Sequence, residues 1–93
     1  MVSGEEAVAI GLATQLSDDP RRDALALAAD LAASNPQAIR GAKWLLNQSG
    51  LVGQEQQFQD EARIMGSLIG SPNQVEAVTA FFEKRPPVFA DPA

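Results

Sequence analysis

The chain has 93 residues, of which 45% are hydrophobic, 20% charged and 5% aromatic, the composition of one small globular domain. It contains no Cys, His or Tyr, which excludes disulfides, thiolate metal sites and Ser-His-Asp triads. Twelve acidic against seven basic residues give a net charge of −5, and such a surface repels nucleic-acid phosphates. No apolar run approaches the ~20 residues of a membrane span, and the start of the chain is acidic where a signal peptide is basic. We therefore expect a cytoplasmic protein with neither a nucleic-acid nor a membrane partner.

Capping signals mark the first two helices. Ser3 followed by Glu6 is a capping-box pattern, which predicts a short helix over residues 4–10. Asp19 suits an N-cap, and Pro20 suits the first helical position because the amide that proline lacks has no partner there in any helix. These signals predict a second helix that begins at Pro20, after a short extended connector.

Three further helices are expected to carry most of the larger apolar residues. Asn35 before a proline predicts a helix over 36–48, a fourth helix should cover 52–69, and the stretch 71–74 has the pattern of a capping box that opens a fifth. The residues at helical spacing that should face the core are Ala38, Ile39, Ala42, Leu45 and Leu46, then Phe58, Ala62, Met65 and Ile69, then Val75, Val78 and Phe82. No strand pattern is visible. The fold class is therefore all-α, with one helical domain over residues 1–93.

Few side chains could carry chemistry. Glu61 borders the apolar stripe of the fourth helix, but a solvated flank explains it more simply than acid-base catalysis does. Arg40 and Lys43 share a helix face and could meet an anion, although a solvated basic face is the default interpretation. Trp44 falls on the polar side of the third helix, and an exposed tryptophan is more typical of a contact surface than of a catalyst.

One aromatic residue and one cation stand together near the end of the fifth helix. Phe81 precedes Lys84 by three residues, so both side chains project on the same side of the helix. A ring can stack on a nucleotide base while an ammonium group neutralises a phosphate. A core phenylalanine beside a helix-terminal lysine is the alternative.

Three stretches, in chain order, resemble the C-terminal third of the enoyl-CoA hydratase/isomerase family, also called the crotonase superfamily. They are VSGEEAVAIGLAT (2–14), ASNPQAIRGAKWLLN (33–47) and GSPNQVEAVTAFFEKRPPVF (70–89). The last is the most specific, because family members end with an acid-Gly pair, Ala-Phe, Glu-Lys-Arg and Pro-x-Phe. Ala77 stands here in place of the usual glycine.

The resemblance implies a particular place in a larger enzyme. In the family, the oxyanion hole and the catalytic glutamates belong to an N-terminal spiral of ββα turns, which we expect this chain to lack, so no catalytic residue is carried over. The C-terminal helices package the active site, build subunit contacts, and place an aromatic residue and a lysine near coenzyme A. Phe81 and Lys84 match those two positions. The ligand is then a coenzyme A thioester bound with the larger domain, and neither a covalent cofactor nor a metal is implied.

Two functions of different class follow. The first is the C-terminal domain of an enoyl-CoA hydratase or isomerase of fatty-acid metabolism, which serves oligomerisation and active-site packaging and is non-catalytic alone. The second is an autonomous helical protein-protein interaction module. Both predict a homo-oligomer, because the aromatic residues exceed what so small a core needs.

Overall fold

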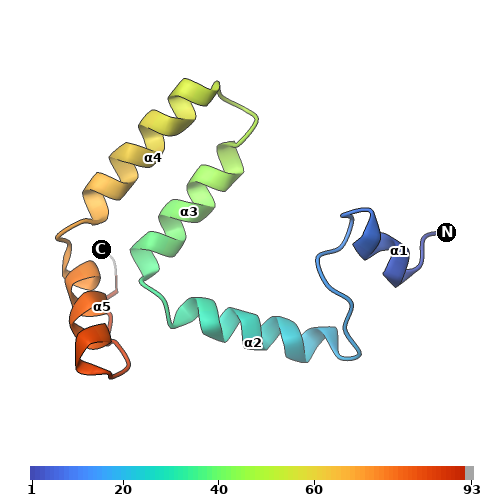
Figure 1. Cartoon of the computed structure of the whole chain (residues 1–93), viewed down its shortest axis with the longest axis horizontal. Coiled ribbons are helices and arrows are strands. Elements are labelled where there is room, and N and C mark those ends of the chain that lie inside the picture. The colour runs from blue at the N-terminus through green and yellow to red at the C-terminus, as the bar shows by residue number, and fades with distance from the viewer. Residues whose placement is uncertain (92–93) are drawn as a thin grey trace. The chain divides into compact units, whose positions relative to one another are not determined.

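The structure, a computed structural model, describes residues 1–91 and contains five α-helices and no strand within them (Figure 1). This confirms the all-α prediction. The helices are α1 (Gly4–Ala9), α2 (Pro20–Ala32), α3 (Pro36–Gln48), α4 (Gln54–Leu68) and α5 (Pro72–Glu83). The chain divides into two compact units, Met1–Asp30 and a second that begins at Leu31. That residues 1–93 fold as one domain stays a prediction.

The N-terminal unit is built on local capping. The Ser3 hydroxyl accepts a hydrogen bond from the Glu6 amide (3.1 Å), and the Glu6 carboxylate accepts one from the Ser3 amide (3.2 Å), which confirms the capping box. Gly11 ends this turn with a φ of 80°, a conformation that favours glycine. Farther along, the Asp19 carboxylate accepts from the Arg22 amide at the start of α2 (3.1 Å), as expected of an N-cap.

Helices α3 and α4 form the main packed pair of the second unit. The Asn35 side chain caps α3 by accepting from the Gln37 amide (3.1 Å), and this helix has the predicted limits. The two helices are in close contact at Gly41, where an added β-carbon would lie 2.7 Å from Cγ2 of Ile64. The absence of a side chain at this glycine therefore allows the contact.

The face that α4 turns toward α3 differs from the prediction. Gln57 and Asp60 lie on the less exposed side of the helix, whereas the predicted stripe points outward: Phe58, Met65 and Ile69 are between 55% and 70% exposed. The prediction was wrong because polar side chains of α4 hydrogen-bond to α3, which turns the apolar stripe away. Leu46 of α3 and all three predicted core residues of α5 are also exposed.

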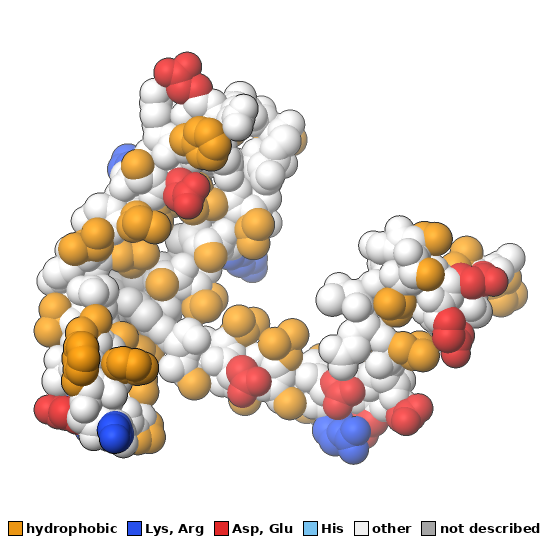
Figure 2. All heavy atoms as spheres, in the orientation of Figure 1, with side chains coloured by type: hydrophobic (Ala, Val, Ile, Leu, Met, Phe, Trp, Pro, Cys, Tyr) orange, Lys and Arg blue, Asp and Glu red, His pale blue; other side chains and the backbone are white. Residues whose placement is uncertain are grey.

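Very little of the second unit is fully buried. Ala80 of α5, at 1% exposure, is the one buried hydrophobic residue in the part of the chain that the structure describes. Figure 2 shows hydrophobic side chains on the visible surface over α4 and α5. The unit thus presents much of its apolar surface to solvent.

The start of α5 also departs from the sequence pattern. The Ser71 hydroxyl donates to the Leu68 carbonyl (2.6 Å), and the Gln74 side chain accepts from the Gly70 amide (3.0 Å), so the predicted capping box is absent. Both polar groups instead close the turn after α4, in which Gly70 has a φ of 80°. Within residues 1–91, no helix is long and apolar enough to cross a lipid bilayer.

Candidate functional site

The C-terminal end of α5 carries the two residues predicted to bind a ligand. Phe81 is 76% exposed, and its ring lies edge-on to that of Phe82, with ring centroids 5.6 Å apart and planes at 78°. Lys84 follows one turn later and is also exposed. The structure therefore leaves both the aromatic ring and the ammonium group accessible, which contradicts the alternative of a core phenylalanine.

Lys84 has an unusual backbone conformation. It is the C-cap of α5 with φ 55° and ψ 45°, the left-handed region that glycine normally occupies at this position. Its amide donates to the Phe81 carbonyl (3.2 Å), and the Arg85 amide donates to the Ala80 carbonyl (3.0 Å), as in a Schellman turn. A non-glycine residue in this region costs about 1 kcal/mol or more.

The neighbouring cation is fully engaged. The Arg85 guanidinium pairs with the carboxylates of Glu76 and Glu83, and Glu76 also accepts from the Val88 amide (3.1 Å). The hydrogen bonds from Arg85 and Val88 hold the pKa of Glu76 below its ordinary value, and the hydrogen bonds to Glu76 and Glu83 raise the pKa of Arg85. Arg85 therefore holds in place the segment that follows α5, residues 85–91, which we call the tail. Of the two neighbouring cations, Lys84 is the one that remains available to a ligand.

Asn73 also holds the tail, through a pair of hydrogen bonds that we call the Asn73 clamp. Asn73 is 5% exposed, and its amide group donates to the Ala90 carbonyl (2.8 Å) and accepts from the Ala90 amide (2.9 Å). The sequence interpretation missed both Asn73 and Glu76, because each has its partner more than eight residues away. The nearest sequence signal was that Glu76 stands among apolar neighbours.

A buried carboxylate joins α3 to α4. Asp60, 8% exposed, accepts hydrogen bonds from Gln48 (2.9 Å) and Gln56 (3.1 Å), and Arg63 lies at 3.4 Å. Gln57 donates to the Leu45 carbonyl (3.0 Å). The bonds from Gln48 and Gln56 are the main cause of a lowered pKa at Asp60. Because side chains satisfy this carboxylate, its role is to hold the hairpin rather than to transfer protons.

A groove lies between α3 and α4, beside the helix crossing. Its volume is about 580 Å³, and its lining residues are Gln37, Arg40, Gly41, Trp44, Arg63, Ile64, Ser67 and Leu68. The Arg63 guanidinium carbon lies 5.5 Å from the centre of the Trp44 ring, a cation–π geometry. The structure thus brings Arg40 and Trp44, which the sequence singled out separately, to one surface with Arg63.

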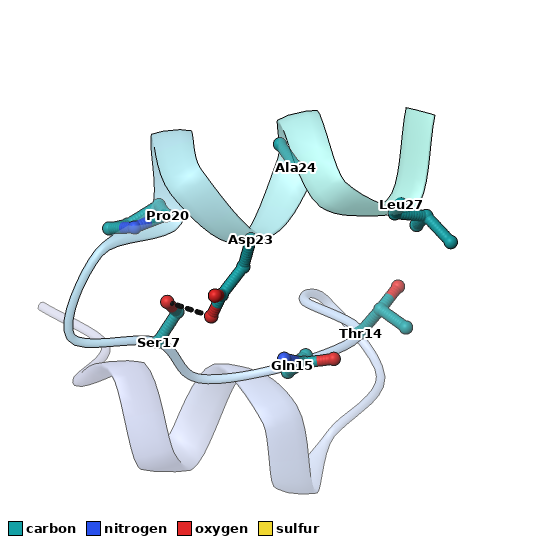
Figure 3. Close-up of a pocket in the computed structure, with 7 residues that line it drawn as sticks. All are labelled: Thr14, Gln15, Ser17, Pro20, Asp23, Ala24 and Leu27. Atoms are coloured by element: carbon teal, nitrogen blue, oxygen red, sulfur yellow. Dashed lines mark hydrogen bonds between the residues drawn. The ribbon is translucent and has the colours of Figure 1, made fainter. Parts of the chain in front are cut away.

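A smaller hollow lies in the N-terminal unit (Figure 3). It has a volume of about 310 Å³ between the connector and the start of α2, and it is lined by Thr14, Gln15, Ser17, Pro20, Asp23, Ala24 and Leu27. The Ser17 hydroxyl donates to the Asp23 carboxylate and accepts from the Asp19 amide (3.1 Å). Since the chain has no histidine to activate this serine, these bonds shape the helix start. Among the described residues, no group of three or more acidic side chains could hold a metal ion.

Two solved structures are similar to this chain over 96% of its length. The DspI protein of Pseudomonas aeruginosa is 33% identical with a TM-score of 0.85, and an enoyl-CoA hydratase from Polaromonas sp. JS666 is 26% identical with a TM-score of 0.84. In both cases the chain spans 35% of the solved chain. No family model and no curated protein sequence matches it.

Proposed function

Because the chain belongs to the enoyl-CoA hydratase/isomerase superfamily, we propose that it is the C-terminal helical part of an enzyme acting on acyl-CoA thioesters in fatty-acid metabolism. In this role it covers the active site and builds the contacts between subunits. The chain spans about a third of the length of the solved proteins it resembles. The resemblance to the family leads us to expect the catalytic groups in the part that this chain does not cover.

The outward apolar face of α4 is the observation that carries this proposal. Phe58, Met65 and Ile69 repeat at helical spacing on a face that nothing in the chain's second unit covers. Each such side chain contributes about 1.5–3 kcal/mol when it is removed from water. A second protein surface is therefore needed to gain that energy, either from the rest of the enzyme or from another subunit.

The end of α5 supports a contact with coenzyme A. Phe81 offers an exposed ring to an adenine, and Lys84 offers an ammonium group to a phosphate one turn away. The strained backbone of Lys84 supports a functional reason for the lysine, because glycine would fit the same turn without that strain. Arg85 cannot take this part, since two carboxylates hold it.

An assay with crotonyl-CoA tests the proposal that this chain is not catalytic by itself. We expect the purified chain to leave the enone absorbance unchanged, because the catalytic glutamates and the oxyanion hole belong to the other domain. Disappearance of that absorbance at enzymatic rates would show that the chain itself catalyses hydration, and the proposal would be wrong.

Light scattering tests the subunit contacts. The chain should self-associate through α4, and the Met65→Ser/Ile69→Ser variant should associate less because it removes apolar area from that face. Both positions are exposed, so circular dichroism should show unchanged helicity. A monodisperse monomer at high wild-type concentration would contradict the proposal.

Calorimetric titration with coenzyme A tests the ligand contact, and the sequence offers a matched control. Lys84→Ala should weaken binding by about tenfold, the worth of one charge-assisted contact, whereas Lys43→Ala should not. Equal affinities for the two variants would remove Lys84 from the site. If an upstream reading frame encodes no larger domain, the alternative of an autonomous interaction module gains support.

A further inference from the structure

The groove between α3 and α4 combines features that suit an acidic protein segment. Arg40 and Arg63 lie on its walls, Lys43 stands one turn from Arg40, and Trp44 is 47% exposed. Tryptophan and arginine are the residue types most enriched at the energetic centres of protein interfaces. Their meeting in one groove favours a macromolecular partner.

The states of Arg63 and Arg40 favour binding of an anion in this groove. The cation–π contact with Trp44 and the 3.4 Å pair with Asp60 hold Arg63 in place, so little side-chain entropy remains to be lost on binding. Arg40 takes part in no salt bridge among the described residues.

The charge of the chain itself points to the occupant. Residues 1–30 contain six acids and two bases, a net charge of −4, while residues 31–93 contain six acids and five bases, a net charge of −1. The N-terminal unit therefore carries four of the five net negative charges in a third of the chain. It also exposes Ile10 and Leu12, apolar side chains that could cover Trp44.

We propose that this groove receives the acidic N-terminal unit, residues 1–30, of a second copy of the chain. Carboxylates of that unit meet Arg40 and Arg63, and apolar side chains cover Trp44. This contact is separate from the apolar face of α4 on which the proposed function rests, so the two can fail independently.

Trp44 makes the proposal measurable, because it is the sole tryptophan and the chain has no tyrosine. The emission of wild-type protein should shift to the red on dilution, together with the dimer-to-monomer transition in sedimentation. Added salt should promote the same shift, since it screens the charges. If the emission wavelength of Trp44 does not change with protein concentration, the proposal is wrong.

Two variants, each defective in one half of the contact, test the pairing directly. Arg40→Glu removes the groove cation, and Glu5→Lys/Asp18→Lys alters two exposed acids that accept no hydrogen bond in the described residues. Each variant alone should associate at least about tenfold more weakly than wild type, as hot-spot substitutions do. An equimolar mixture should recover association, because one copy supplies an intact groove and the other an intact acidic unit.

The control is Asp91→Lys, a charge reversal at an exposed residue that belongs neither to the groove nor to the apolar face of α4, and it should associate like wild type. If Arg40→Glu associates as tightly as wild type, or if the mixture is no tighter than its components, the proposal is wrong. Loss of association in Met65→Ser/Ile69→Ser alone would leave the proposed function standing and remove only this inference.

Discussion

Gly41 of α3 and Ile64 of α4 define how closely the hairpin can close, since a β-carbon on the glycine would stand 2.7 Å from Cγ2 of the isoleucine. A distance below 3.0 Å forces a neighbour to move, and the branched Ile64 side chain has little freedom to do so. Hydrogen bonds of Gln57 and Asp60 to α3 join the same two helices.

Gly41→Ala should accordingly destabilise the chain by about 1–3 kcal/mol, the usual cost of overpacking, despite the better helix propensity of alanine. Gly66→Ala is the matched control: it lies in α4, where an added β-carbon meets nothing within 4 Å, and it should stabilise by up to about 1 kcal/mol. Urea unfolding of both variants measures the difference. Equal effects of the two substitutions would show that the hairpin is not closely packed at Gly41.

The carboxylates of Asp60 and Glu76 should make the chain sensitive to acid. Their hydrogen bonds lower both pKa values in the folded state, below the ordinary 3.8 and 4.5. The unfolded chain therefore binds protons first, so the stabilisation is complete above these ordinary values and is lost as the pH falls below them. Thermal melts should show a midpoint that falls steeply below about pH 4.5, and Asp60→Asn/Glu76→Gln should flatten that dependence. An equally steep profile in the double variant would assign the acid sensitivity to other groups.

The Asn73 clamp predicts a local opening of the tail. Asn73→Ala leaves the Ala90 amide and carbonyl without their partner, and losing such part-buried hydrogen bonds costs about 1 kcal/mol each. Hydrogen exchange at the Ala90 amide should speed up, while exchange within α3 should stay as in the wild type. Gln74→Ala is the control on the same helix, because its side chain bonds only to the Gly70 amide. Unchanged exchange at Ala90 in Asn73→Ala would refute the clamp.

Substitution of Lys84 by glycine should have opposite effects on the stability of the chain and on its affinity for coenzyme A. Lys84→Gly should raise the midpoint of thermal unfolding, since glycine adopts a φ of 55° without the cost of about 1 kcal/mol borne by lysine. The same substitution should weaken coenzyme A binding, because it removes the ammonium group. A variant that gains stability and keeps its affinity would show that the lysine has no part in the ligand contact.

The sequence predicted where helices begin and end, because capping depends on residues only a few positions apart. Asn35 caps α3, and this helix ends at Gln48, as expected. The orientation of α4 could not be predicted, since Gln57 and Asp60 find their partners twelve residues away on α3. The glutamine-rich first half of that helix was the available signal that its inner face is polar.

The candidate site was predictable to a similar extent. Phe81 and Lys84 follow from a local pattern and lie exposed together at the end of α5, as a ligand contact requires. The sequence could not predict that, within residues 1–91, Arg85 is ion-paired whereas Lys84 is not. The ion pair of Arg85 with Glu76 forms only because the tail folds back toward α5. The groove at Trp44 likewise needs Arg63 from another helix.

The clamp between Asn73 and Ala90 also bears on the order of folding. Ala90 lies seventeen residues after its partner, and a ribosome adds residues from the N-terminal end, so the buried amide of Asn73 waits until nearly the whole of this segment has been synthesised. The α3–α4 hairpin closes over a shorter stretch and can form first. We therefore expect the hydrogen bonds between Asn73 and Ala90 to form after the α3–α4 hairpin.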